Sequence, residues 1–251
     1  MPREEVEHRR RVALVTGASR GIGRAIGLRL ATGGLAVAVG YHRERAAAEA
    51  VCDEIRRAGG RAVAVGGDLA RVDTAGAMVR RVEQELGPVD VLVSNAGAAV
   101  TATLPELDVA EWDRTMNAHL RAAFLLSQRV APGMQQRCWG RIVVISSVAA
   151  FSGGIVGPHY TAAKAGQLGL VRSLSGALAP HGVTVNAVAP ALVETGMLAQ
   201  LAGDRRERLA ERIPVGRFGH PAEVAEVVWT VVENGYLTGQ TISVDGGLHP
   251  R

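Results

Sequence analysis

Short apolar runs alternate with longer amphipathic patterns along the whole chain. The runs are rich in Val, Ala and Ile and show no strict polar/apolar alternation, which is typical of strands covered on both faces. They lie at residues 11–16, 35–40, 61–67, 89–95, 141–147, 183–189 and 241–245. Helical patterns lie at residues 21–33, 44–58, 71–86, 111–136, 158–179 and 221–233. This alternation predicts repeated βαβ units and an α/β protein with a doubly wound, seven-stranded parallel sheet.

The chain shows no internal repeat, low-complexity segment or Pro/Gly/Ser-rich linker that would divide it. Its 251 residues, 47% of them hydrophobic, can bury a sizeable core. We therefore expect one domain over residues 12–251, after a flexible N-terminal extension at residues 1–11. No apolar stretch approaches the roughly 18 residues of a membrane span, and residues 1–11 lack the apolar core of a signal peptide. We expect a cytoplasmic protein with no membrane partner.

The net charge of +4 does not indicate a nucleic-acid partner, because the basic residues are scattered among acids except at residues 9–11. The two cysteines, Cys52 and Cys138, lie far apart without metal-ligand spacing, so we expect neither a disulfide nor a metal site. Of the 28 basic residues 27 are arginine, and Lys164 is the one lysine. A lysine kept amid such arginine bias suggests a position that needs a compact ammonium group.

A glycine-rich turn, TGASRGIG at residues 16–23, follows the first expected strand and opens a helix. Glycines there permit a tight turn and close approach of a pyrophosphate, and the helix N-terminus supplies amide donors. A plain glycine-rich turn is the alternative, but the strand, turn, helix and following βα units fall where a dinucleotide-binding Rossmann fold needs them. The predicted cofactor contacts of this turn are Gly17, Ser19, Arg20, Gly21, Ile22 and Gly23.

The end of the second expected strand favours NADP(H) over NAD(H). An NAD-binding domain normally places Asp or Glu there to bond the ribose 2′-hydroxyl, whereas this chain has Tyr41, His42 and Arg43. Arg43, with His42 and Arg20, could meet a 2′-phosphate through charge-assisted hydrogen bonds. Solvated surface positions are the alternative for both arginines, so the missing carboxylate is the stronger argument.

Ser147 ends the fifth expected strand, and Tyr160 and Lys164 follow at the start of a helical pattern. Residues at i and i+4 share one helix face. A nearby ammonium favours the phenolate and should lower the tyrosine pKa toward working pH, as a general acid for carbonyl reduction requires. Such a pair alone is mostly structural; together with the cofactor turn it predicts a reacting centre of Ser147, Tyr160 and Lys164.

From about residue 12 to residue 247 the chain resembles the short-chain dehydrogenase/reductase family. The resemblance rests on residues 16–23, Asp68-Leu69, Asn95-Ala96-Gly97, Asn117, Ser147, Tyr160/Lys164, residues 190–195 and residues 245–247. It implies four catalytic residues: Tyr160 donates the proton, Ser147 bonds the substrate oxygen, Lys164 holds the nicotinamide ribose, and Asn117 positions a water. It also implies cofactor contacts at Asp68, Leu69, Asn95, Ala96, Gly97, Tyr160, Lys164, Pro190, Val193 and Thr195.

Three positions depart from the family's usual pattern: Ser94, Ala163 and Ala191. None of them removes a catalytic group. The family assembles through surfaces like the last strand, with Val244, and the helix at residues 221–233, so the resemblance implies a homotetramer.

Within the family, the chain is most similar to 3-oxoacyl-acyl-carrier-protein reductases and polyketide-type ketoreductases. This implies NADPH-dependent reduction of a ketone to a secondary alcohol, with a 3-oxoacyl thioester on an acyl carrier protein as substrate. One alternative is a stand-alone carbonyl reductase or alcohol dehydrogenase for a free small ketone or secondary metabolite. The other is a non-catalytic module that senses NADP(H), against which the complete catalytic set argues.

An acidic carrier protein would be attracted by a basic surface. The candidates are Arg121, Arg129, Arg137 and Arg141, which could equally be a solvated helix face; His181 stands where a second carrier-facing arginine is frequent. The substrate pocket is expected from residues 149–159 and 192–218, the second of which contains Met197, Leu198, Leu201 and Ile213. His159 is either a substrate contact or a helix-start histidine that faces elsewhere.

Overall fold

The computed structural model describes residues 10–196 and 203–250. Its seven strands form one parallel sheet in the order β3-β2-β1-β4-β5-β6-β7, which confirms the predicted fold class. The strands are β1 (Val12–Val15), β2 (Ala36–Tyr41), β3 (Ala62–Gly66), β4 (Val89–Ser94), β5 (Gly140–Ile145), β6 (Val183–Pro190) and β7 (Thr241–Val244). β1 begins where the extension was expected to end, but residues 1–9 of that extension lie outside the described residues, as do Met197, Leu198 and Leu201.

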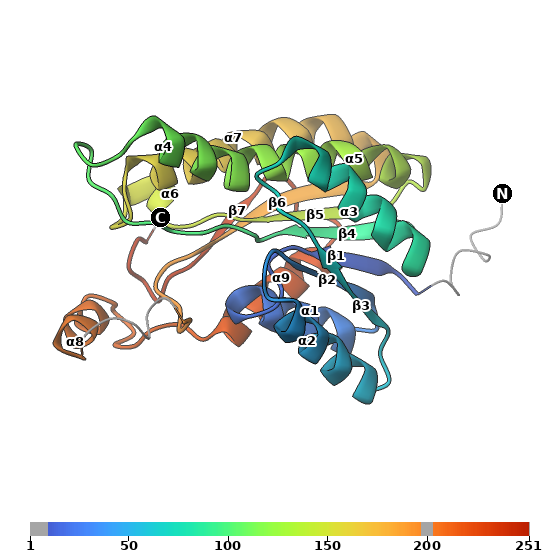
Figure 1. Cartoon of the computed structure of the whole chain (residues 1–251), viewed down its shortest axis with the longest axis horizontal. Coiled ribbons are helices and arrows are strands. Elements are labelled where there is room, and N and C mark those ends of the chain that lie inside the picture. The colour runs from blue at the N-terminus through green and yellow to red at the C-terminus, as the bar shows by residue number, and fades with distance from the viewer. Residues whose placement is uncertain (1–9, 197–202, 251) are drawn as a thin grey trace.

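Helices cover both faces of the sheet (Figure 1). One layer contains α1 (Gly21–Thr32), α2 (Arg45–Arg57) and α9 (Pro221–Glu233); the other contains α3 (Val72–Glu85), α4 (Val109–Met116), α5 (Ala122–Gln136) and α7 (Pro158–Leu178). Successive strand residues point to opposite faces: Val12 and Leu14 join the core beneath the second layer, and Ala13 and Val15 join the core beneath the first. Both faces of the central strands β1, β4, β5 and β6 are therefore buried, which explains their continuous apolar runs.

Three further short elements are α6 (Ala149–Ser152), the 3₁₀ turn η2 (Ala179–His181) and α8 (Gly203–Glu211). α8 stands away from the sheet (Figure 1). Within the described ranges, no helix combines the length and apolar character needed to cross a bilayer.

The helix expected at residues 111–136 is interrupted. α4 ends at Met116, a π-helical turn η1 spans Asn117–Arg121, and α5 continues from Ala122. In η1 the Ala122 N–H donates to the Asn117 carbonyl, five residues back. The apolar periodicity runs through this turn, so the sequence pattern does not reveal it. Single π turns inside α-helices occur frequently at functional sites.

The strand order places β1 between β2 and β4. The chain leaves β1 toward one face of the sheet and reaches β4 from the other, so a crevice opens at their carboxyl ends. The glycine-rich turn after β1 and residues 95–97 after β4 lie at this edge.

Candidate active site

The turn after β1 has the backbone that its glycines predict. Gly17 and Gly21 have φ of +63° and +55°, in the left-handed region that side chains disfavour. A Cβ at Gly23 would overlap the Gly17 carbonyl oxygen. Because α1 packs so closely against the turn, its first backbone amides lie beside the crevice.

Asn95 and Thr16 hold this turn from below. Asn95 Nδ2 donates to the carbonyls of Thr16 (2.9 Å) and Gly17 (3.2 Å). Thr16 Oγ1 accepts hydrogen bonds from the backbone N–H groups of Asn95 (3.0 Å) and Ala96 (2.9 Å). Both N–H groups of the Asn95 side-chain amide, which was expected to contact the cofactor, are thus hydrogen-bonded to the turn. Thr16 joins the two loops, a role that sequence reasoning missed although the residue heads the motif.

The start of α1 fits a dinucleotide pyrophosphate. Among the described residues no side chain caps this helix, and its first turn contains no acidic residue. The first amides of a helix lack intrahelical acceptors and carry partial positive charge, so they can receive an anionic group. Ile22 lines the adjoining pocket, and a Cβ at Gly21 would contact Thr195.

The expected 2′-phosphate end is exposed and charged. Arg43 and His42 are exposed after β2, and His42 Nε2 lies 3.9 Å from Asp68 Oδ2. Arg20 Nη1 lies 2.8 Å from Glu44 Oε1, with the two side chains 77% and 44% exposed. Sequence reasoning missed Glu44, which comes three residues after Tyr41 at the N-cap of α2.

The remaining residues near β2 and β3 contribute mainly to packing. Tyr41 lies over Gly66, where a Cβ would come 2.7 Å from Tyr41 Cζ. Leu69 is buried in the core beneath α3 and α5. Asp68 Oδ1 accepts a hydrogen bond from the Ala70 N–H at 3.0 Å.

A pocket of about 190 Å³ opens beside the glycine turn. The predicted residues that line it include Ile22, Asn95, Gly97, Ser147, Tyr160, Lys164, Pro190, Val193 and Thr195. The same walls contain His119 and Leu192. The structure therefore brings the expected reacting centre and the expected nicotinamide end of the cofactor site into one pocket.

Ser147, Tyr160 and Lys164 are tied to the backbone around them. The Tyr160 and Ser147 side chains are hydrogen-bonded to each other, and Ser147 Oγ accepts from the Ala149 N–H at 3.1 Å. Lys164 Nζ, in a residue only 4% exposed, donates to the Ile145 carbonyl at 2.7 Å. These bonds fix α7 against the end of β5, so the three groups face one space.

Burial controls the protonation of this centre. It lowers the pKa of Lys164 to about 7 and raises the pKa of Tyr160, an effect that the Ser147 hydrogen bond opposes. The net lowering of the Tyr160 pKa expected from the sequence is therefore not found, because loss of hydration disfavours the phenolate. Lys164 Nζ lies 5.5 Å from the Tyr160 ring centroid and bonds the Ile145 carbonyl instead. Tyr160 is therefore held as a protonated phenol.

Asn117 and His119 differ in their placement. Of the two, His119 lines the pocket, and Asn117 is not among the described residues that do. Residues two apart on a helix do not face the same side, so a turn that directs His119 inward directs Asn117 elsewhere. The catalytic place expected for Asn117 thus finds no support in the geometry. The signal available in the sequence was a histidine within an otherwise apolar helix face.

The other candidate substrate contacts separate in the same way. His159 is fully buried, its Nε2 donates to the Val100 carbonyl at 3.0 Å, and it is outside the described pocket lining. Ile213 packs with Phe218 in a small separate cluster. Of the second stretch expected to form the pocket, residues 192–218, Leu192, Val193 and Thr195 line it.

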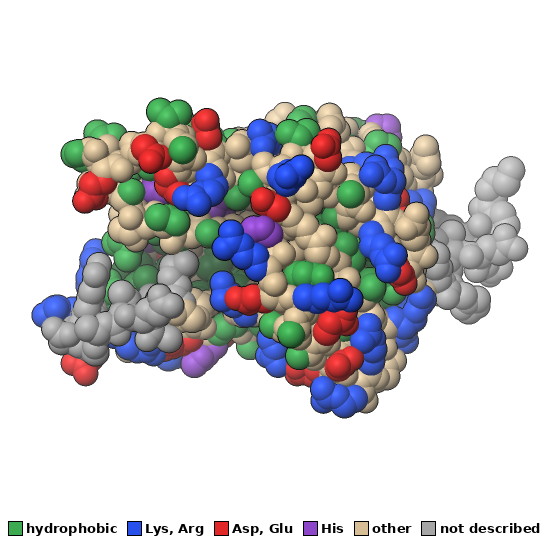
Figure 2. Space-filling view, viewed as in Figure 1, with side chains coloured by type: hydrophobic (Ala, Val, Ile, Leu, Met, Phe, Trp, Pro, Cys, Tyr) green, Lys and Arg blue, Asp and Glu red, His purple; other side chains and the backbone are tan. Residues whose placement is uncertain are grey.

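Three of the four arginines expected to attract a carrier protein have structural partners. Arg121 donates to the Ala70 carbonyl, Arg137 to the Val89 carbonyl, and the buried Arg141 to the Val232 carbonyl. Arg129 is exposed. On the face shown in Figure 2, basic and acidic side chains are interspersed.

Comparison with known proteins agrees with this architecture. A family model described as short chain dehydrogenase matches residues 11–206. The 3-oxoacyl-[acyl-carrier-protein] reductase FabG of Staphylococcus epidermidis is 39% identical, over 94% of this chain and 98% of that protein. Nodulation protein G of Azospirillum brasilense is 37% identical, over 95% and 98%.

Solved structures give the same result. The 3-oxoacyl-[acyl-carrier protein] reductase of Brucella melitensis superposes with a TM-score of 0.91 at 33% identity, covering 97% of this chain and 93% of that chain. A putative gluconate dehydrogenase from Agrobacterium tumefaciens has a TM-score of 0.89 at 31% identity, covering 95% of each chain. The chain therefore belongs to the short-chain dehydrogenase/reductase family and is an oxidoreductase.

Proposed function

We propose that this protein reduces a ketone to a secondary alcohol with NADPH, and that the ketone is a 3-oxoacyl thioester carried by an acyl carrier protein. The observation that carries the proposal is the pocket in which Ser147, Tyr160 and Lys164 meet the end of the glycine turn. The similarity to 3-oxoacyl-[acyl-carrier-protein] reductases supports the substrate class.

Each residue of the reacting centre has a separate role in the proposed carbonyl reduction. Bound nicotinamide supplies the hydride. The Ser147 hydroxyl donates a hydrogen bond to the substrate oxygen, and the protonated Tyr160 phenol gives that oxygen its proton, as general acid catalysis requires. Lys164, beside Tyr160, would hold the nicotinamide ribose of a bound cofactor, and its protonated form would place positive charge near the phenolate that proton transfer leaves.

The exposed side chains after β2 support NADPH as the cofactor. Arg43 and Arg20 would pair with a 2′-phosphate, and no described carboxylate belongs to β2 itself. Glu44, paired with Arg20, works against this preference because a carboxylate repels the phosphate and competes for the arginine. We infer that the preference for NADPH rests mainly on Arg43.

Initial rates test the function directly. NADPH and NADH oxidation would be measured with an acetoacetyl thioester, both on a carrier protein and on a short pantetheine mimic, beside a panel of free ketones and diketones. Turnover of the thioester with NADPH supports the proposal. Preference for NADH would overturn the cofactor assignment, and turnover of free ketones alone would overturn the substrate class.

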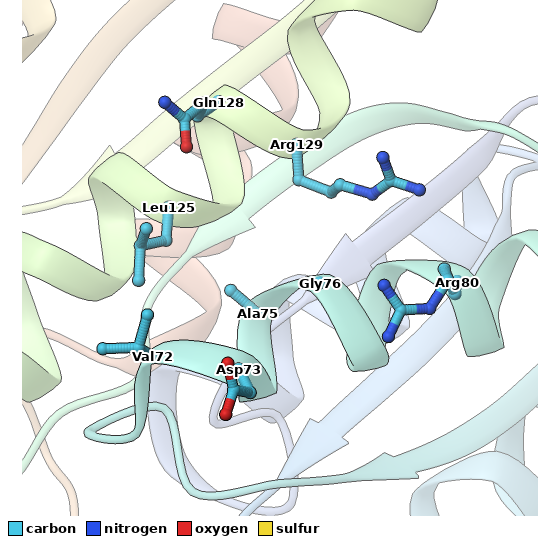
Figure 3. Close-up of a pocket in the computed structure, with 8 residues that line it drawn as sticks. All are labelled: Val72, Asp73, Ala75, Gly76, Arg80, Leu125, Gln128 and Arg129. Carbon is cyan, nitrogen blue, oxygen red and sulfur yellow. The ribbon is translucent and has the colours of Figure 1, made fainter.

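The hydrogen bonds that the arginines make within the fold favour the second candidate, a reductase of free ketones. Arg121, Arg137 and Arg141 bond backbone carbonyls, which leaves fewer basic groups for an acidic carrier. Arg129 of α5 and Arg80 of α3 remain, on facing walls of a groove between these helices (Figure 3). Replacing both with alanine should raise the KM of the carrier-bound thioester and leave that of the pantetheine mimic unchanged if a carrier docks there. If the double variant and the parent have the same KM for the carrier-bound thioester, no carrier docks in this groove, which favours a free ketone as the substrate.

We also propose a homotetramer. β7 is one of the two edge strands of the sheet, and its apolar Ile242 and Val244 are only partly buried against the core that includes α9. An edge with unpaired backbone groups and apolar side chains is suited to pairing with another copy. Light scattering that shows a stable monomer would contradict this proposal.

A further inference from the structure

His119 is held in one tautomer and one orientation. Its Nε2 lies 2.8 Å from the Ala98 carbonyl. A carbonyl only accepts hydrogen bonds, so Nε2 carries the proton and Nδ1 is a bare acceptor. The backbone carbonyl of His119 accepts a hydrogen bond from Gln167 Nε2 at 3.1 Å. The residue therefore links the loop after β4, the π turn η1 and the helix α7 that carries Tyr160 and Lys164.

The imidazole lies directly beside the proton donor. Its ring meets the Tyr160 ring edge to face, with centroids 5.4 Å apart and an interplanar angle of 86°. On its other side the ring lies against Gly97, where a Cβ would overlap it. His119 is 3% exposed and lines the pocket. His119 therefore forms the wall of the pocket directly beside the Tyr160 ring.

Two properties of the His119 ring bear on its role: an unpartnered nitrogen and a lowered pKa. Nδ1 is buried and accepts no hydrogen bond from any described residue. Buried polar atoms without partners are rare, and each calls for an explanation such as a role in catalysis. Burial, followed by the charge of Lys164, lowers the pKa of His119 to about 3; the Ala98 hydrogen bond opposes this shift, and His159 adds a smaller lowering effect. The ring is thus neutral at working pH and does not carry the proton itself.

We propose that His119, in place of Asn117, is the positioning residue beside the proton donor: its Nδ1 is the hydrogen-bond acceptor at the pocket wall, which gains its donor when cofactor binds. This inference rests on the proposed reduction, because it assigns His119 a task in the same proton transfer. It makes the residue a neutral acceptor, not an acid or base.

Variants at residue 119 separate this role from packing. His119→Phe keeps an aromatic edge against Tyr160 but removes both nitrogens, so kcat should fall at least about tenfold while the KM of the ketone changes by less than about threefold. His119→Asn supplies an amide donor and acceptor without a ring and should keep kcat within about threefold of the parent. Asn117→Ala is the matched comparison and should cost no more than about twofold, because that residue does not face the pocket.

The outcomes decide in both directions. A Phe variant as active as the parent would show that His119 only fills space. An Asn117→Ala loss equal to that of His119→Phe would return the role to Asn117. If His119→Phe fails to bind NADPH or to fold, His119→Asn decides alone, since a loss beyond about tenfold in that variant overturns the proposal.

A measurement without turnover keeps this inference distinct from the proposed function. In nitrogen NMR of the labelled protein, the His119 Nδ1 resonance is identified among seven histidines by its loss in His119→Asn. It should be that of a bare imine in the free protein and move upfield, as on accepting a hydrogen bond, when NADP⁺ is added. An unchanged resonance in the cofactor complex overturns the acceptor role, whereas failure of every ketone to react would overturn only the proposed function.

Discussion

The two ends of the cofactor crevice are built differently. At the reacting end, Lys164 and His119 are almost fully buried and each is hydrogen-bonded to a backbone carbonyl. At the end after β2, Arg20 and Glu44 form an exposed ion pair and Arg43 is open to solvent. Buried groups lose hydration, which shifts their pKa values and fixes their geometry, whereas exposed charges are screened and adjustable. We therefore expect the chemistry to depend on the buried end and the choice between cofactors to depend on the exposed end.

The largest expected effect is at Tyr160. Tyr160→Phe keeps the ring between His119 and Lys164 but removes the proton, so kcat should fall by about 10²- to 10⁴-fold. NADPH affinity, followed by cofactor fluorescence, should stay within about threefold because the glycine turn is untouched. Retained turnover would mean that another group donates the proton.

The next effect is at the glycine turn. A methyl group at Gly23 would overlap the Gly17 carbonyl oxygen. Relief of this overlap must displace the turn and its amides from the position that would receive the pyrophosphate, and each 1.4 kcal/mol of binding free energy lost in this way is about tenfold in affinity. Gly23→Ala should therefore raise the Kd of NADPH and NADH together by about tenfold or more. The control is Gly169→Ala on α7, where a Cβ meets open space, and both Kd values should stay unchanged. Gly34 also faces open space, but its φ of +91° makes an alanine there strained.

Burial of Lys164 predicts a dependence of stability on pH. Its folded pKa of about 7 lies below the usual lysine value of 10.5, so between these values the unfolded chain holds a proton that the folded chain lacks. The free energy of unfolding should then rise with pH from about 7 to about 10.5, and the gain should be lost as pH falls through 7. Urea unfolding of the parent and of Lys164→Met isolates this effect as their difference. A difference that does not vary with pH would show that Lys164 is protonated throughout.

The smallest effects are expected at the exposed end. Arg43→Ala should raise the KM of NADPH by about three- to tenfold, as for loss of a hydrogen bond to a charged group at an exposed site, and leave that of NADH unchanged. Glu44→Gln should lower the KM of NADPH by no more than about fivefold, since it frees Arg20 from a surface ion pair. An equal change for both cofactors would remove the argument for a 2′-phosphate site.

Features set by local periodicity follow from the sequence by itself. The alternation of apolar runs and helical patterns determined the doubly wound sheet, because each strand buried on both faces must be apolar throughout. The spacing of Tyr160 and Lys164 placed both on one face of α7, and the glycines at residues 17 and 21 determined a turn that only they adopt easily.

Only the tertiary structure decided which polar side chains reach the pocket. His119 and Asn117 lie two residues apart, and the π turn η1 and its packing against α7 direct the histidine inward. Arg137 and Arg141 read as surface residues, but the carbonyls of Val89 and Val232, distant in sequence, meet them in the fold. In the sequence Glu44 is only a residue at the start of a helix; the fold brings Arg20 beside it as an ion-pair partner. A side chain's direction and charge environment depend on elements brought together from far along the chain, which periodicity does not encode.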